Sequence, residues 1–273
     1  MCDLCVIESV KQRMLSRRDL FKGAASVAAA GAIAATATAP AALADGHSKV
    51  EDMSYAYDDK FPTYFGAPGI SMEQKFNFKE HGFNLMQLSI NEHTGTHLDA
   101  PLHFSADGQA VNEIPVENLV VPLCVIDIRE TAVRDDDAQV TPGDLKAWIS
   151  KNGPIPDKAC VAMLSGWQQH VTTEKYRNVG DDEKMHFPGF HVEAAQMLIE
   201  ETGAVGMAVD TLSLDHGISA DFVTHYAWLP TNRWGIENIA NLDKVPEAGA
   251  TLVVGAPTHK GGTGGPARIF AMM

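Results

Sequence analysis

The segment 93–103 constrains the fold of this chain more than any other, because it carries three histidines and an aspartate. These residues are separated by even offsets, so a straight strand would place them on one face but spread them over about 33 Å. No single site is that long. Gly95 and Pro101 lie between them and favour bends. We therefore expect a strand end that curls into a compact loop and gathers four side chains: His93, His97, Asp99 and His103.

The chemistry of this segment points to a divalent metal ion. Imidazole and carboxylate ligands suit Zn, Mn or Fe(II) better than Ca or Mg. No cysteine accompanies these residues, which argues against a structural zinc knot. The alternative is that each histidine has its own separate place in the core or on the surface. Three histidines and one aspartate within eleven residues, around one Gly and one Pro, make that alternative less favoured. The segment therefore predicts a metal centre.

The first 44 residues have the layout of a twin-arginine (Tat) export signal. Arg17 and Arg18 precede an Ala-rich apolar run over 23–39, and Ala42-Leu43-Ala44 offers a cleavage site for small residues. The run is short and weakly apolar for a transmembrane anchor. We therefore expect export by the Tat machinery to the periplasm, with no stable membrane anchor after cleavage. Cys2 and Cys5 fall in this leader, and we assign them no function.

The remaining chain is predicted to be a linker or arm over 45–60 and one domain over 61–273. Residues 84–92 alternate between apolar and polar side chains, which is typical of a strand with two unlike faces. Apolar runs predict buried strands, and capping signals predict helices between them. The result is an α/β fold, a single domain with a mixed central β-sheet or partial barrel flanked by helices. The expected strands cover 119–128, 159–164, 204–212 and 251–255, and the expected helices cover 142–151 and 192–201.

Composition excludes several classes of function. A net charge of −14 argues against nucleic acid or an anionic membrane surface as a partner. The chain has no G-x-S-x-G motif, so a serine hydrolase is disfavoured. Cys124 and Cys160 lie in strand-like apolar runs, where two buried thiols are favoured over a disulfide.

The histidine segment resembles a known signature. His93-x-Gly95-Thr96-His97-x-Asp99-x-Pro101-x-His103 is similar to the H-x-G-T-H-x-D-x-P-x-H motif of the cyclase family. This family of metal-dependent hydrolases includes bacterial kynurenine formamidases and isatin hydrolases. The resemblance extends over about 50–273 and includes four further elements: the D-T-x-S-x-D pattern at 210–215, the distal His225, Glu237-Asn238, and the glycine-rich 261–268, where Gly265 replaces a serine.

The resemblance implies a ligand set. The residues matching His93, His97 and Asp99 bind one divalent metal in the family, and those matching His103, His225 and Glu237 bind a second metal or flank the first. The resemblance implies Mn or Zn as the metal, with one or two ions per subunit. A catalytic metal needs an open position, which six protein ligands on one octahedral ion would not leave. Two arrangements therefore stay open: two metals bridged by Asp99, or one metal on a subset of the ligands with His103 as base.

The implied activity is hydrolysis of an acyl C–N bond in a small molecule by metal-activated water. The substrate would be an aryl formamide such as N-formylkynurenine or a cyclic amide such as isatin, and His103 or Glu237 would move the proton. The alternative is a catalytically inactive periplasmic metal- or ligand-binding protein of the same fold. The resemblance also implies a homo-oligomer, dimer or tetramer. Aromatic side chains are candidates for a wall against a flat substrate, and the substrate-binding candidates are Trp167, Phe65, Phe187 and Ser213, with Tyr64 beside them.

Overall fold

The computed structural model describes residues 49–273. The predicted export signal, with Cys2 and Cys5, lies outside the described residues. The described chain forms a main body of residues 49–71 and 90–273, while residues 72–89 form a separate compact unit. The two are described separately below.

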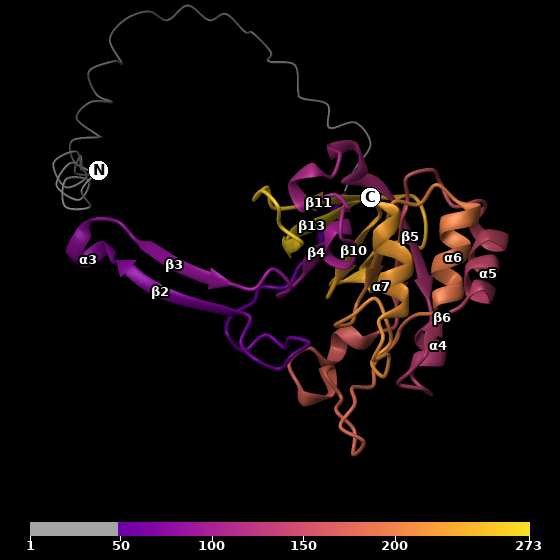
Figure 1. The fold of residues 1–273 in the computed structure, drawn as a ribbon, viewed down its shortest axis with the longest axis horizontal. Helices are drawn as coiled ribbons and strands as arrows, with labels where there is room; N and C mark the ends of the chain where they lie inside the picture. The colour runs from indigo at the N-terminus through magenta and orange to yellow at the C-terminus, as the bar shows by residue number, and fades with distance from the viewer. Residues whose placement is uncertain (1–48) are drawn as a thin grey trace, which may run out of the picture. The chain divides into compact units, whose positions relative to one another are not determined.

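The main body is built on a nine-stranded sheet in the order β1-β13-β11-β5-β7-β9-β10-β4-β12 (Figure 1). The four central strands β5, β7, β9 and β10 are parallel, and the strands toward both edges pair antiparallel. In sequence order the strands are β1 (Val50–Asp52), β4 (His97–Asp99), β5 (Val120–Asp127), β7 (Cys160–Leu164), β9 (Gly206–Val209), β10 (Trp234–Glu237), β11 (Ala250–Gly255), β12 (Gly264–Pro266) and β13 (Arg268–Met272).

Both faces of the central strands are buried, and alternate side chains enter two different cores. On β5, Cys124 and Ile126 belong to the core beneath the helices, whereas Leu123 and Val125 belong to the core on the other face. This second core is made by strands and loops, and it takes residues from strands near both edges of the sheet, such as Leu98. The sheet is therefore curled like a half-barrel around its second core.

Helices cover the first face of the sheet (Figure 1). Thr141 caps the principal helix α5 by accepting a hydrogen bond from the Asp144 backbone N–H, and Pro142 occupies its first turn. The α-helices of the main body are α4 (Arg129–Ala132), α5 (Pro142–Asn152), α6 (Val192–Glu201) and α7 (Val223–Trp228). The 3-10 helices are η1 (Pro101–Phe104), η2 (Val111–Glu113), η3 (Val116–Asn118), η4 (Trp167–His170), η5 (Glu174–Tyr176), η6 (Leu229–Thr231) and η7 (Leu242–Lys244).

Two small sheets complete the described chain. The strands β6 (Gln139–Val140) and β8 (Gly189–Phe190) pair in parallel. A hairpin is formed by β2 (Ile70–Phe76) and β3 (Leu85–Ile90), with the short helix α3 (Phe78–His81) at its tip (Figure 1). Asn77 caps α3 by accepting from the Glu80 backbone N–H, and Gly82 ends it in the left-handed conformation.

The predicted α/β class with a mixed sheet is confirmed. Strand and helix boundaries agree within a few residues, since β5, β7, β11, α5 and α6 lie within or beside the predicted ranges. Cys124 and Cys160 are buried free thiols, as predicted. The segment 45–60, predicted as a linker or arm, supplies the edge strand β1, and its Met53 is fully buried. None of the helices in the described residues has the length and apolar character needed to cross a bilayer.

Candidate metal centre

Two neighbouring strands place the first three candidate ligands. β4 runs antiparallel to β10, with His97 directly opposite Glu237. Side chains alternate along a strand, so His97 and Asp99 share the face to which Glu237 also belongs. The Nε2 atom of His97 lies 3.3 Å from Asp99 Oδ1 and 3.3 Å from Glu237 Oε2. Cross-strand pairing thus unites residues far apart in the sequence.

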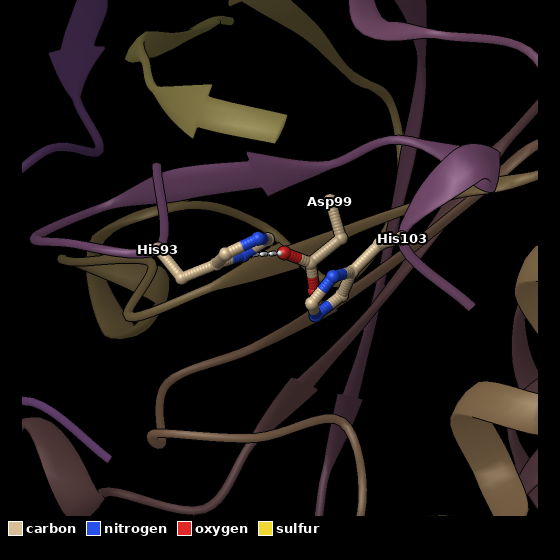
Figure 2. A group of neighbouring side chains, drawn as sticks. All are labelled: His93, Asp99 and His103. Carbon is tan, nitrogen blue, oxygen red and sulfur yellow. Dashed lines mark hydrogen bonds and ion pairs between the residues drawn. The ribbon is translucent and has the colours of Figure 1, made fainter. Parts of the chain in front are cut away.

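Two bends bring in His93 and His103. Gly95 adopts a φ of 66°, and a Cβ at this position would lie 2.7 Å from the Tyr57 ring, so glycine is required at this turn. Pro101 begins η1, which carries His103 back toward the strand. Figure 2 shows the side chains of His93 and His103 next to that of Asp99, and His93 Nδ1 lies 2.8 Å from Asp99 Oδ1. The two imidazole rings stack with centroids 3.9 Å apart.

The bends at Gly95 and Pro101 therefore occur where the sequence places them, but the segment between them differs from the prediction. His97–Asp99 is the regular strand β4 within the main sheet, not part of a compact loop. The reason is that β4 pairs on both sides, with β10 and with β12. Such long-range pairing leaves no local signal in a three-residue strand.

The remaining ligand candidate, His225, comes from α7. Its Nε2 atom lies 3.1 Å from Glu237 Oε1 and 3.6 Å from Asp99 Oδ2. Asp99 therefore lies at the centre of the cluster, with one oxygen toward His93 and His97 and the other toward His225. The other five predicted ligands surround this carboxylate.

The cluster has the properties of a cation site. Asp99 Oδ2 and His97 Nε2 are buried and make no hydrogen bond within the described residues. Leaving such groups unsatisfied costs about 1–3 kcal/mol each, and a cation between them would remove that cost. Two sets of ligand atoms can converge on an ion, and they share Asp99: His93, Asp99 and His103, and His97, Asp99 and Glu237.

Burial and the neighbouring charges both act on the pKa values of the cluster. Burial opposes ionisation of Asp99, but the neighbouring His225 and His93 hold the pKa of its carboxyl well below the usual range. Burial disfavours the proton on His97, yet Asp99 and Glu237 raise its pKa to about 10. His103 differs, since burial lowers its pKa to about 4 despite the nearby Asp99. His103 is therefore neutral at pH 7.

The outer nitrogens of two histidines are fixed by hydrogen bonds. Nδ1 of His97 lies 2.9 Å from the Gly95 carbonyl oxygen and donates to it. Nδ1 of His225 lies 2.6 Å from Asp215 Oδ2 and donates in the same way. Asp215 also accepts from the backbone N–H groups of Thr224 and His225. These bonds aim both Nε2 atoms at the centre, as is usual for metal-binding histidines.

We expect the exchange Asp215→Asn to weaken metal binding about 10- to 100-fold, because the carboxylate that orients His225 is lost. A competition titration with a chromogenic chelator measures the affinity. Asp221→Asn is the matched control, since it makes the same exchange at an exposed position in the same loop. Equal affinity in Asp215→Asn and the control would show that this carboxylate does not position His225.

A cavity of about 90 Å³ reaches the cluster. Its walls include three of the ligand candidates (His93, His97 and Glu237) and the loop of residues 62–69, with Tyr64 and Phe65. Trp167, Phe187 and Ser213 are not part of this lining. Trp167 and Phe187 instead pack in a small buried core with Tyr176 and Leu212, so the cavity gives their predicted role in substrate binding no support.

Several residues near the site had no assigned role in the sequence analysis. Phe222 adopts a left-handed φ of 51°, and its ring lies 5.5 Å from both Tyr64 and Phe104. Asn238 donates to the Gly95 carbonyl oxygen and so supports the turn that carries His93 and His97. The family-like Glu237-Asn238 pair was the available signal for Asn238, whereas Phe222 had none. A separate cavity of about 1000 Å³ lies between segments 55–62 and 171–179, and none of the six ligand candidates lines it.

Comparisons with known proteins agree with this fold. Residues 51–216 match the model of the Cyclase family, described as "Putative cyclase". The isatin hydrolase of Roseibium aggregatum is 30% identical over 193 residues, which cover 67% of this chain and 73% of that protein. The kynurenine formamidase of Salinibacter ruber is 26% identical over 196 residues, covering 70% of this chain and 81% of that protein. The structure of isatin hydrolase A from Labrenzia aggregata, bound to benzyl benzoate, superposes with a TM-score of 0.76 at 33% identity, covering 82% of this chain and 93% of that one.

Proposed function

This chain belongs to the cyclase family, and we propose that it is a metal-dependent hydrolase that cleaves an acyl C–N bond in a small molecule. One observation carries the proposal. Asp99 and five other metal-competent side chains converge beside a cavity, and two of their buried polar atoms have no hydrogen-bond partner within the described residues. The relatives named isatin hydrolase and kynurenine formamidase support amide hydrolysis as the reaction class.

The donor set suits Mn or Zn, and we propose one or two ions per subunit. His93, His97 and Asp99 would hold the first ion, and His225 and Glu237 would hold a second or flank the first. When bound, a divalent ion lowers the pKa of water and polarises a carbonyl group. Asp99 and Glu237 bring two negative charges, which balance one such ion.

Two observations favour one of the two candidates for moving the proton. Both oxygens of Glu237 are engaged, since Oε2 lies beside His97 and Oε1 lies beside His225 and accepts from the Leu214 backbone N–H. The ring nitrogens of His103 have no hydrogen-bond partner among the described residues, and the ring is neutral at pH 7. We therefore propose His103 as the general base and Glu237 as a ligand.

For the substrate we propose a flat aromatic amide, either an aryl formamide such as N-formylkynurenine or a cyclic amide such as isatin. Tyr64 and Phe65 in the cavity wall offer aromatic contact to such a molecule. Trp167, Phe187 and Ser213 lie outside this wall, so the proposal rests on the loop of residues 62–69.

The test combines metal analysis with a turnover assay on isatin and N-formylkynurenine. We expect close to one or two equivalents of Mn or Zn and hydrolysis of at least one substrate. Less than about 0.1 equivalent of metal, with none restored on incubation with Mn or Zn, would overturn the proposal. Full metal content without turnover of either substrate would favour the alternative, a catalytically inactive binding protein of the same fold.

We also propose that the protein is exported to the periplasm by the twin-arginine route, on the strength of residues 1–44. Replacing both arginines by lysine (Arg17→Lys with Arg18→Lys) keeps the charge and should retain the protein in the cytoplasm. Cell fractionation measures this, and Lys11→Arg is the control. Unimpaired export of the double variant would contradict the twin-arginine route.

A further inference from the structure

The glycine-rich segment 261–265 lies beside the candidate metal centre, although none of its residues is a ligand candidate. It leads into β12, which pairs with β4, and in this pairing Gly264 lies opposite Asp99. The backbone N–H of Ala100 also donates to the Thr263 carbonyl oxygen, at 2.8 Å. The backbone of the segment is therefore fixed against the strand that carries Asp99.

Two glycines of this segment permit a close approach that a larger residue would block. A Cβ at Gly264 would collide with a carbonyl oxygen of β4 and would lie 3.1 Å from Cε1 of His93. A Cβ at Gly262 would lie 2.7 Å from Oε1 of Glu92. Because both positions are glycine, the side chain of Thr263, which lies between them in the sequence, reaches both Glu92 and His93.

Thr263 connects these two side chains by hydrogen bonds. Its hydroxyl oxygen Oγ1 lies 2.5 Å from Glu92 Oε2 and 3.2 Å from His93 Nε2. Its backbone N–H donates to the same carboxylate, at 3.1 Å from Oε2 and 3.2 Å from Oε1. On the solvent side, Nε2 of His259 lies 2.6 Å from Glu92 Oε1. Both oxygens of Glu92 therefore have partners, and the carboxylate is held in place.

These contacts determine which nitrogen of His93 carries the proton. At pH 7 Glu92 is a carboxylate, which can only accept hydrogen bonds. A threonine hydroxyl has one proton, and Thr263 donates it to Glu92. The Thr263 oxygen must then accept from His93 Nε2, so the proton of the neutral imidazole is on Nε2. The other nitrogen, Nδ1, has a free lone pair and lies 2.8 Å from Asp99 Oδ1.

His93 is thus oriented in the opposite sense to two other histidines of the cluster. His97 and His225 donate from Nδ1 and direct Nε2 to the centre. His93 donates from Nε2 and directs Nδ1 to it. A nitrogen lone pair and a carboxylate oxygen that face each other are two acceptors without a proton between them. A cation between them would stabilise this arrangement.

We propose that Thr263 and Glu92 are positioning residues of the metal centre: Thr263 holds the proton of His93 on Nε2, and Glu92 holds Thr263. The inference rests on the proposed function, because it assigns Nδ1 of His93 as the atom offered to the catalytic metal. It gives the glycine-rich segment the role of bringing a hydroxyl group to the outer nitrogen of a ligand. Neither residue lines the cavity of about 90 Å³, so neither is assigned a contact with substrate.

The first test is the affinity for Zn, measured by competition with a chromogenic chelator. Thr263→Val removes the hydroxyl group but keeps the branched shape, and it should weaken Zn binding about 10- to 100-fold. Thr263→Ser keeps a hydroxyl group and should bind Zn nearly as tightly as the wild type. Thr258→Val is the matched control, because it makes the same exchange at an exposed position of the same loop. Equal affinities in Thr263→Val and the control would overturn the inference.

A double-mutant cycle tests whether Glu92 acts through Thr263. Glu92→Gln offers an amide that can donate to the hydroxyl group and reverse the hydrogen bond, so this variant should also bind Zn more weakly. In the Thr263→Val background the same exchange should have little further effect, because the hydroxyl group through which it acts is gone. Losses that add up in the double variant would contradict the role given to Glu92.

The position of the proton is a readout that a merely structural role would not determine. In the Zn-loaded protein, the NMR chemical shifts of the ring nitrogens distinguish a metal-bound nitrogen from one that carries a proton. We expect Zn on Nδ1 of His93 and the proton on Nε2. Zn on Nε2 would overturn the inference and leave the proposed hydrolase intact. The expected arrangement without turnover of isatin or N-formylkynurenine would count against the proposed function alone, whereas a protein that binds no metal would overturn both.

Discussion

Replacing Asp99 by asparagine should remove both metal and hydrolytic activity, with a fall in kcat/KM of at least about 10³-fold. Asp99 is fully buried, belongs to both groups of converging ligand atoms, and lies within 3.6 Å of three histidines. Asparagine keeps the volume but removes the negative charge that offsets a divalent cation. The amide also turns N–H donors toward histidine nitrogens that need an acceptor.

Metal content by mass spectrometry and turnover of the active substrate measure the result together. Asp107→Asn makes the same exchange at an exposed position of the same segment, and it should keep both properties. Circular dichroism of Asp99→Asn separates loss of the ion from loss of the fold. Retained metal and activity in this variant would mean that the ligand assignment is wrong.

The sequence predicts the ligands that lie within one short segment, but not those that join the site through contacts between distant segments. The gathering of His93 and His103 around Asp99 follows from local spacing and from bends at Gly95 and Pro101, all within one short segment. Glu237 joins only because β10 lies beside β4, and such pairing between distant segments has no local signal. His225 and Glu237 were therefore available only through the family resemblance.

The helices and strands of the main body were likewise predictable only where the local sequence carries a signal. Helix α5 was predictable because Thr141 and Pro142 give local start signals. The strand β4 was not, because three residues are too few for a periodicity. The sequence also does not show which aromatic side chains are buried away from the site. The aromatic rings of Trp167 and Phe187 have the composition of a substrate wall, yet they pack into a separate small core.

For the β2–β3 hairpin, the sequence predicts the strand but not its burial. The alternation over 84–92 correctly predicts the strand β3 and its two unlike faces. The same pattern normally implies that one face is buried by the chain itself. In the structure the side chains of that face are exposed, so the periodicity predicts the strand correctly but not its burial.

His103→Gln should lower kcat by about 10²- to 10⁴-fold while the metal content stays unchanged, because a base is lost and a ligand is not. Glu237→Gln should instead lose metal and activity together, since both oxygens of Glu237 are committed to the cluster. His170→Gln serves as the control, a partly exposed histidine outside the six-residue cluster. Loss of metal in His103→Gln would show that His103 is a ligand of a second ion.

Two further measurements test whether His103 accepts a proton, because a purely structural role of His103 would change neither of them. Added imidazole should partly restore turnover in His103→Ala. The pKa of His103 is lowered to about 4 by burial, so the ring stays unprotonated as the pH falls from neutrality to about that value. Protonation of His103 should therefore not limit wild-type activity until the pH approaches 4. An acidic limb near neutrality that vanishes in His103→Gln would contradict this, because it would place the pKa of His103 close to its ordinary value.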